Sequence, residues 1–213
     1  MSSTEQRLIA AAERLFAEQG VGAVSLRTVM QAAETNVAAI HYHFGSKEGL
    51  LDAVLRGRLD QVTGERNAAL AGLAEGEVTA RELAVAFVRP VVAVLGSGGE
   101  HWIRLVGRLL TTDEKGLSTL SDSFLQRNAR FVELLERESP GTPRRTLDFR
   151  LTQAMHLTLN VLGDIERVRR LVAPDADPRA WPLDEVVADL VDVVTAVLAG
   201  PSGERQIPPS FRS

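Results

Sequence analysis

Apolar residues recur every three or four positions along most of the chain, which is the spacing expected of amphipathic α-helices. No stretch shows the strict alternation of apolar and polar residues that is typical of half-buried β-strands. Glycine- and proline-rich segments separate the apolar runs. The pattern therefore predicts an all-α protein with helices at about 4–19, 26–33, 36–43, 47–73, 79–95, 100–110, 117–138, 143–172 and 183–199.

Three short helices fall within the first fifty residues, and the sequence marks where they begin. Ser3 and Gln6 have the spacing of a capping box at the first helix. Ser25 can cap the second short helix, and Ser46 can cap the long helix that follows the third. A turn of three to four residues around Glu34 separates the second and third helices, which is the layout of a helix-turn-helix unit.

The same region carries a distinctive run of residues. Residues 24–55 read VSLRTVMQAAETNVAAIHYHFGSKEGLLDAVL. This run resembles the N-terminal DNA-binding domain of the TetR/AcrR family, whose third helix ends in His-Phe-Gly-x-Lys-Glu-x-Leu, as His43–Leu50 do here. The resemblance is close over about residues 5–60 and continues beyond them mainly as a similar layout of helices. It implies a DNA-binding transcriptional regulator that forms an all-helical homodimer and binds a small molecule.

The resemblance also divides the chain into domains. It implies a helix-turn-helix DNA-binding domain over 1–50 and a larger α-helical ligand-binding and dimerisation domain over 51–200. The helix at 47–73 would link the two. A tail over 201–213, which contains Pro208-Pro209, is expected to be disordered.

Charge does not by itself identify a DNA-binding protein here. The chain carries 24 basic and 28 acidic residues, a net charge of −4, and residues 1–60 carry six basic and seven acidic residues. DNA-binding domains are usually positive, because neutralising phosphates releases counterions and drives affinity. The DNA-binding hypothesis therefore depends on the motif and its spacing.

Other features limit the class of protein. The absence of cysteine excludes disulfides, a thiolate nucleophile and a cysteine-ligated metal. No metal or other cofactor is expected, because His41 and His43, two residues apart on a helix, point about 200° apart and cannot chelate one ion. Neither a signal peptide nor a membrane-spanning stretch is visible, so we expect a cytoplasmic protein with no membrane partner.

The candidate DNA contacts cluster around the second and third short helices. Val37, Ala38 and Ala39 are small, so the backbone can approach the major groove and touch thymine methyl groups. Histidine and tyrosine side chains nearby can donate to phosphate oxygens. Lys47 shares an anion site with the free N–H groups behind the Ser46 cap. The full set of expected contacts is Ser25, Arg27, Thr35, Asn36, Val37, Ala38, Ala39, His41, Tyr42, His43 and Lys47.

Several of these positions have a second interpretation. Arg27 can read a guanine or clamp a phosphate, but it can also be a solvated surface charge. Asn36 can contact a base edge or cap its helix, and Tyr42 can contact a phosphate or belong to the core. Glu34 stands where the family commonly has glycine, and a non-glycine residue in a left-handed turn costs about 1 kcal/mol. His41 stands where the family commonly has tyrosine.

The last two helices, at about 143–172 and 183–199, are apolar on more than one side. Such a helix is either buried within one subunit or shared with a partner. In the family that the chain resembles, these two helices form a four-helix bundle with their copies. A two-fold dimer would place two recognition helices about 34 Å apart on a palindromic operator.

Apolar residues of the middle helices are candidates to line a pocket for a small apolar ligand. His156 and Asn160, four residues apart, can orient the polar end of such a ligand, although His156 can equally be a satisfied core histidine. Residues 101–110 loosely resemble family members that sense long acyl chains, so a fatty acyl compound is one candidate. The same apolar residues can also be plain core. The expected lining is Phe87, Val91, Trp102, Leu105, Leu109, Phe124, Phe131, Met155, His156, Leu159 and Asn160.

Together these features favour a repressor that a small apolar ligand releases from a palindromic operator. One alternative is a small-molecule-binding protein of the same fold without operator binding, which the charge of the N-terminal domain favours. Another is an all-α enzyme that uses histidine and aspartate for acid–base chemistry. Its candidate groups are His101, His156, Asp113, Asp122 and Asp164. No nucleophile elbow, phosphate loop or metal-ligand cluster accompanies them, so we expect no enzymatic activity.

Overall fold

The computed structural model describes residues 3–73, 76–112, 126–172, 177 and 181–201, with the side chains of 37–39 and 112 excepted. These ranges contain helices and turns but no β-strand, which confirms the all-α prediction. Of the helix predicted at 117–138, the part before residue 126 lies outside the described residues. The helices are α1 (Thr4–Gln19), α2 (Leu26–Ala32), α3 (Val37–Phe44), α4 (Lys47–Ala71), α5 (Ala80–Gly96), α6 (Glu100–Thr112), α8 (Ala129–Glu138), α9 (Arg144–Gly163), α10 (Ile165–Val172) and α11 (Leu183–Ala199).

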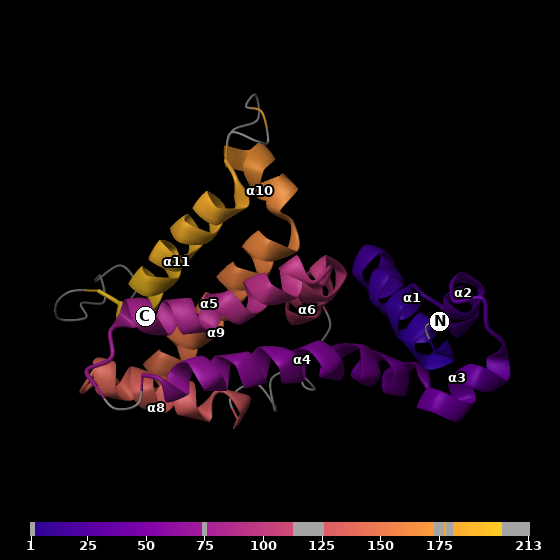
Figure 1. Ribbon diagram of the computed structural model, residues 1–213, viewed down its shortest axis with the longest axis horizontal. Helices are drawn as coiled ribbons and strands as arrows, with labels where there is room; N and C mark the ends of the chain where they lie inside the picture. The colour runs from indigo at the N-terminus through magenta and orange to yellow at the C-terminus, as the bar shows by residue number, and fades with distance from the viewer. Residues whose placement is uncertain (1–2, 74–75, 113–125, 173–176, 178–180, 202–213) are drawn as a thin grey trace, which may run out of the picture.

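One long helix joins two parts of the molecule. α1, α2 and α3 form a small unit at one end, and α4 runs from this unit into a larger body made of the remaining helices (Figure 1). α4 packs on α1 and α3 in the small unit and on α5, α6 and α8 in the body. Any tilt of α4 would therefore move the small unit relative to the body.

The small unit is held together by capped helix ends and an apolar core. Ser3 and Gln6 form a complete capping box at the start of α1. The Ser25 and Ser46 hydroxyls accept backbone N–H groups at the starts of α2 and α4. Ile40 of α3 is only 1% exposed, so it anchors that helix to the core as the sequence predicts.

α5 lies at the centre of the larger body and packs against α4, α6, α8, α9 and α11. Phe87 on this helix meets Phe131 of α8 edge-on, with ring centroids 5.4 Å apart. Pro90 is buried inside the same helix. Because proline has no N–H, the carbonyl of Ala86 loses its usual helical donor, although α5 continues past this point without a break.

The prediction of one helix over 143–172 is wrong, because the chain breaks at Asp164 into α9 and α10. Asp164 leaves the helical region with φ −153° and ψ 66°, and its carboxylate accepts the N–H of Arg167 at 3.2 Å to cap α10. Just before it, Gly163 packs against Arg104 of α6, whose Nε donates to the Gly163 carbonyl at 3.1 Å. A local cap and a tertiary contact thus divide a segment whose apolar spacing is continuous.

Candidate DNA-binding surface and ligand cavity

The C-terminal turn of α3 projects three ring side chains into solvent. His41, Tyr42 and His43 are all exposed, and Tyr42 is exposed to 85%. Phe44 is half-buried against the core of the small unit. Tyr42 is therefore a surface residue rather than a core aromatic, and its contact with a phosphate stays a prediction. The side chains at 37–39 lie outside the described residues.

His41 does not offer both of its ring nitrogens to a ligand. Its Nδ1 lies 3.1 Å from the carbonyl oxygen of Gly45, and because a carbonyl only accepts, Nδ1 must carry the hydrogen. In the neutral ring Nε2 is then an acceptor and cannot donate to a phosphate. A phosphate contact from His41 therefore requires the imidazolium form, whereas the hydroxyl of Tyr42 donates without a change of charge.

A shallow depression lies between the start of α1 and the exposed end of α3. Its lining comprises Thr4, Arg7, Glu34, Thr35, Asn36, Tyr42 and His43. The fold thus brings four of the expected contacts together and adds Thr4 and Arg7, which the sequence analysis missed. Arg7 is exposed on the second turn of α1. Only the packing of α1 beside α3 reveals that this cation belongs to the same surface.

The turn before α3 keeps a left-handed residue although glutamate replaces the glycine that is common in the family. Glu34 adopts a positive φ of 51°, alone among the described non-glycine residues. The N–H of Thr35 donates to the carbonyl of Met30 at 3.0 Å. The Thr35 hydroxyl oxygen is buried and has no hydrogen-bond partner within the described chain. It therefore faces the protein rather than the solvent from which DNA would approach.

Three further expected contacts flank α3. The Ser25 hydroxyl accepts the N–H of Thr28 at 3.1 Å, so capping α2 already occupies part of its hydrogen-bonding capacity. Arg27 is exposed on α2 and forms no hydrogen bond or ion pair with another described residue. Lys47 is half-buried at the first position of α4, directly after the Ser46 cap. Arg27 and Lys47 are thus cations beside the recognition helix that no described carboxylate neutralises.

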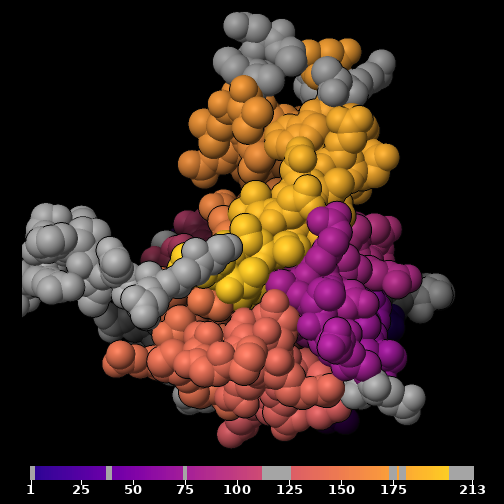
Figure 2. Space-filling model, turned by 90° about the vertical axis from the view of Figure 1, so that its left-hand side faces the viewer, coloured from indigo at the N-terminus to yellow at the C-terminus, as the bar shows by residue number. Residues whose placement is uncertain are grey.

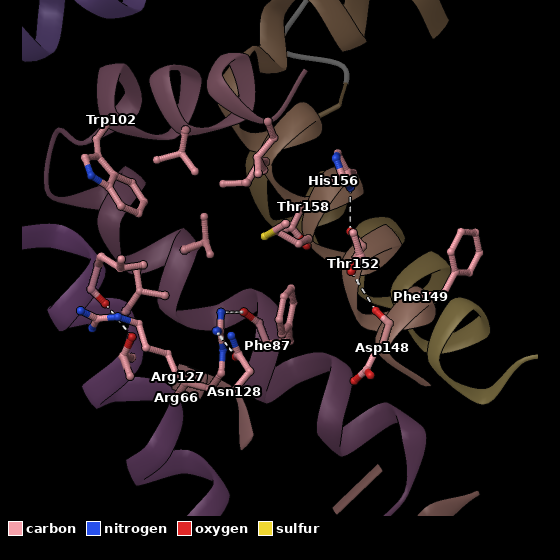
Figure 3. Close-up of a pocket in the computed structure, with 18 of the residues that line it drawn as sticks. Arg66, Phe87, Trp102, Arg127, Asn128, Asp148, Phe149, Thr152, His156 and Thr158 are labelled. Atoms are coloured by element: carbon pink, nitrogen blue, oxygen red, sulfur yellow. Dashed lines mark hydrogen bonds between the residues drawn. The ribbon is translucent and has the colours of Figure 1, made fainter. Parts of the chain in front are cut away.

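A cavity of about 360 Å³ lies in the larger body between α4, α5, α6 and α9 (Figure 3). This volume is within the range of small-molecule sites. Phe149, which is 64% exposed, and the exposed Arg145 place its mouth at the first turns of α9. Six residues expected from the sequence line the wall, namely Phe87, Val91, Trp102, Met155, His156 and Leu159.

Other residues expected in the lining are elsewhere. Leu105, Leu109 and Phe131 are buried in the core without lining the cavity, Asn160 is exposed, and Phe124 lies outside the described residues. Asn160 follows His156 by four residues, a step that turns the side chain about 40° around the helix axis. This rotation carries Asn160 from the rim of the cavity into solvent.

The register of α6 explains the two leucines. The cavity is lined by Trp102, Val106 and Leu110, each of which follows the one before it by four residues. Leu105 and Leu109 occupy the adjacent side of the helix and are equally buried. Because α6 is buried over a wide arc, apolar spacing shows which residues are inside but not which of them face an open space.

Two family models match the chain. The model described as "Bacterial regulatory proteins, tetR family" matches residues 8–54, and "Tetracyclin repressor-like, C-terminal domain" matches residues 85–197, which is more than half of the chain. The chain belongs to the TetR family. The resemblance drawn from the helix-turn-helix run is thus confirmed, and it extends into the larger body.

A part of this TetR-family chain also resembles HTH-type transcriptional repressors. It is 38% identical over 64 residues to the HTH-type transcriptional repressor KstR2 of Rhodococcus jostii, a match that covers 30% of this chain and 31% of that protein. It is 35% identical over 60 residues to KstR2 of Mycobacterium tuberculosis, which covers 28% of this chain and 30% of that protein. The matched part is therefore less than a third of either relative.

Solved structures resemble the TetR-family chain over nearly its whole length. A TetR-like transcriptional regulator from Rhodococcus sp. RHA1 is 18% identical, with a TM-score of 0.60 and coverage of 93% of this chain and 97% of that one. Mycobacterium smegmatis AmtR is 17% identical, with a TM-score of 0.61 and coverage of 95% and 89%. At these identities the similarity shows the fold. The family model over residues 8–54 is one of bacterial regulatory proteins, and the KstR2 relatives are transcriptional repressors rather than enzymes.

The residues considered for an enzyme have other roles where the structure describes them. Nδ1 of His156 lies 2.8 Å from the carbonyl of Thr152, and Asp164 caps α10. Asp113 and Asp122 lie outside the described residues. No group of three or more histidine, aspartate or glutamate side chains in the described ranges is placed to hold a metal ion. No described helix is long and apolar enough to cross a bilayer.

In this TetR-family chain, α6 connects the cavity to the small unit. The indole Nε1 of Trp102 donates to the carbonyl of Leu55 in α4 at 3.2 Å. From the other side of α6, Arg108 donates to the carbonyl of Glu18 at 3.3 Å, in the last turn of α1. A cation at the end of a helix is favourable, because the terminal carbonyls carry partial negative charge. The cavity wall is thus linked to both helices that position the DNA-binding surface.

Arg66 on α4 is a buried charged group of the cavity lining that was not expected from the sequence. Arg66 is 6% exposed, and its NH1 donates to Oδ1 of Asn128 at 2.6 Å. Its guanidinium carbon lies 4.2 Å from the ring centroid of Phe87 (Figure 3). Burial lowers the pKa of Arg66 to about 10, so it remains charged at neutral pH. A sequence signal existed, because Arg66 continues the buried stripe of Leu59 and Val62 on α4.

Proposed function

We propose that this chain is a ligand-responsive repressor that binds a palindromic operator as a homodimer and leaves it when a small apolar ligand occupies the cavity. One observation carries the proposal: Trp102 lines the cavity and donates to Leu55 in α4. α4 begins at Lys47, directly after the recognition helix α3. A molecule in the cavity would therefore press on the element that sets the position of α3.

The proposed operator contacts are the expected set around α2 and α3, with Arg7 added and the side chain of Thr35 left out, because its hydroxyl is buried. Arg27, Lys47 and Arg7 supply the positive charge for phosphates, and Tyr42 supplies an exposed hydroxyl. The backbone of α3 at 37–39 would enter the major groove, where small side chains permit a close approach. Because the small unit is slightly acidic, these few cations must be concentrated on the DNA-facing side.

We propose that dimerisation uses α9 and α11, in line with the expectation for the last two helices. α11 lies at the surface along its outer side, next to α5 and the start of α9 (Figure 2). Val193 on this side is 49% exposed, although the opposite side of α11 is buried against α5 and α9. Apolar side chains left exposed on a packed helix are typical of a subunit interface. Two-fold pairing would allow two α3 helices to reach successive major grooves, about 34 Å apart.

The proposed mechanism is an equilibrium between two dimer shapes that differ in the tilt of α4. A ligand shifts such an equilibrium only by its difference in affinity for the two shapes. The cavity would supply this difference in affinity. Its walls belong to α4 and α6 as well as to α5 and α9, so a tilt of α4 would change its shape. Filling it would favour the shape in which α4 is displaced and the two recognition helices no longer match the operator.

A gel-shift experiment with DNA from upstream of the protein's own gene tests the proposal. We expect retardation that specific DNA competes away and unrelated DNA does not, and a small apolar ligand should reverse it. A variant with Arg27→Ala and Lys47→Ala should bind more weakly by about 1–3 kcal/mol per lost contact while remaining dimeric in light scattering. Sequence-independent binding, or equal binding by the double variant, would contradict the assignment of the contacts.

A second candidate is a protein of this family that binds a small molecule but no operator. The excess of acidic over basic residues within 1–60 favours it. The same gel shift separates the two candidates, because this one predicts ligand binding without specific retardation of any promoter fragment.

A further inference from the structure

Arg66 occupies an unusual environment for a charged side chain. It projects from α4 into the lining of an otherwise mainly apolar cavity, together with Asn128 and Phe87 (Figure 3). No carboxylate in the described chain pairs with it. A buried charge normally has a partner of opposite sign, because removing an ion from water without compensation is costly.

The guanidinium of Arg66 is also incompletely hydrogen-bonded. It carries five N–H donors, of which NH1 donates to Asn128 Oδ1 at 2.6 Å and NH2 donates to the Phe87 carbonyl at a long 3.4 Å. Nε is buried and has no partner among the described groups. Buried donors are rarely left unpaired in native proteins, and those that are need an explanation.

The charges around the cavity also favour a negatively charged ligand. Among the residues that the structure describes, three arginines line it, Arg66, Arg127 and Arg145, against one carboxylate, Asp148. Asp148 is paired with Arg144, 3.0 Å away, and Arg127 is paired with Asp60. Arg145 lies exposed at the mouth. The path from the mouth to Arg66 is therefore positive, which favours the entry of an anion.

We propose that the cavity recognises an amphipathic carboxylate, whose carboxylate pairs with the guanidinium of Arg66 and whose apolar body fills the rest of the cavity. A planar carboxylate matches the fork of an arginine and can accept from two of its N–H groups at once, including Nε. A compact head group fits the confined site better than a bulky one. The proposal rests on the proposed function, since it assigns the chemistry of the ligand at the same cavity.

The apolar wall fixes the orientation of such a ligand. With the carboxylate at Arg66 on α4, the body would extend along Val91, Trp102 and Met155. Its far end would then touch α6. Through Trp102 and Arg108, this helix donates hydrogen bonds to the Leu55 carbonyl of α4 and to a carbonyl in the last turn of α1. The anionic group would thus supply affinity and selectivity, and the apolar body would supply contact with the helix that leads to the DNA-binding unit.

Calorimetric titration of the full-length protein with two matched pairs of probes tests the proposal. The pairs are octanoate with 1-octanol, and 4-cyclohexylbutyrate with 4-cyclohexylbutanol, which differ only in the head group. We expect each carboxylate to bind about ten- to hundredfold more tightly than its alcohol, the range expected for hydrogen bonds to a charged partner. Equal affinities within both pairs, or no binding of either carboxylate, would overturn the proposal.

Substitutions of Arg66 locate the selectivity. Arg66→Met keeps an unbranched apolar stem but removes the guanidinium and its charge, so the preference for the carboxylates should disappear. Arg66→Lys keeps the charge without the fork and should retain part of the preference, which covers the case in which Arg66→Met does not fold. Arg130→Met is the matched control, because Arg130 is an exposed arginine that pairs with Glu133 and does not line the cavity. A preference that survives in both Arg66 variants, or that is lost in Arg130→Met, would assign the selectivity to another group.

The response of the operator complex separates this proposal from the proposed function. If octanoate binds selectively through Arg66 but never alters operator binding, the carboxylate site stands and the ligand-responsive repressor fails. If the protein binds its operator specifically but prefers neither carboxylate, the regulator stands and the carboxylate site fails.

Discussion

The indole N–H of Trp102 donates to the backbone carbonyl of Leu55 at 3.2 Å, which joins α6 to the middle of α4. The indole ring also forms part of the cavity wall. The Leu55 carbonyl lies within α4 and already serves as an ordinary helical acceptor, so the bond from Trp102 is an additional one. One side chain therefore belongs both to the wall of the cavity and to a contact with the helix that leads to α3.

Trp102→Phe should weaken both stability and the ligand response. The substitution removes the hydrogen bond and leaves space in a buried position, so we expect the free energy of unfolding to fall by about 1–3 kcal/mol. The ligand should also reduce operator affinity by a smaller factor in the variant than in the wild type. Urea denaturation and operator titrations with and without ligand measure the two effects. An unchanged ligand response would remove Trp102 from the connection between cavity and DNA.

Glu34→Gly should stabilise the protein. Glu34 has a positive φ of 51°, which costs a residue with a side chain about 1–2 kcal/mol and costs glycine little. Glycine adds flexibility to the unfolded chain, so the net gain in unfolding free energy should be at most about 1 kcal/mol. Glu34→Ala is the control, since it removes the same carboxylate but keeps the strain. Equal stability of the two variants would show that the turn is not strained.

Val193→Arg should break the dimer. A charged side chain in the middle of an apolar interface would be buried without a partner, so light scattering should report monomers at concentrations where the wild type is dimeric. Operator affinity should fall with it, because two recognition helices must bind together. Val85→Arg on α5 is the control, since Val85 is exposed to 41% and lies outside both 143–172 and 183–199. A dimer that survives Val193→Arg would place the interface elsewhere.

The lowered pKa of Arg66 predicts a specific dependence of stability on pH. Burial lowers the pKa to about 10 in the folded state, whereas the unfolded chain keeps the higher ordinary value. Between these two values the unfolded state binds more protons, so the stability of the wild type should rise with pH. The wild type's free energy of unfolding, relative to that of Arg66→Met, should rise by up to about 1.4 kcal/mol per pH unit above pH 10. At lower pH this difference between the two proteins should not change with pH.

Urea denaturation of the wild type and of Arg66→Met between pH 8 and pH 11 measures this difference directly. Lysine and tyrosine side chains titrate equally in both proteins, so their contribution cancels in the comparison. A difference in stability that stays constant across the whole range would show that the charge of Arg66 is not buried in the folded protein.

The sequence was sufficient for features that depend on neighbouring residues. The capping serines at 3, 25 and 46 and the turn around Glu34 between the second and third helices follow from local spacing. Six cavity-lining residues were also predicted, because apolar spacing on α5, α6 and α9 shows which side of each helix is buried.

The sequence was insufficient where two distant segments decide the outcome. Leu105 was expected to line the cavity beside Trp102, but the register between α6 and its neighbours assigns that place to Val106. The break at Asp164 depends in part on the contact of Gly163 with Arg104 on another helix. Periodicity reports burial, and it does not report which neighbour covers a residue.

By itself, the sequence determined that this chain is helical, that it contains a helix-turn-helix unit, and where most helices begin, since these properties arise from residues within a few turns of one another. Only the tertiary structure decided that Arg7 lies beside Tyr42 and that Arg66 is buried in the cavity wall with Asn128. The physical reason is distance along the chain. Whether a charged side chain is solvated, paired within the chain or available to a ligand depends on segments that meet only when the helices pack.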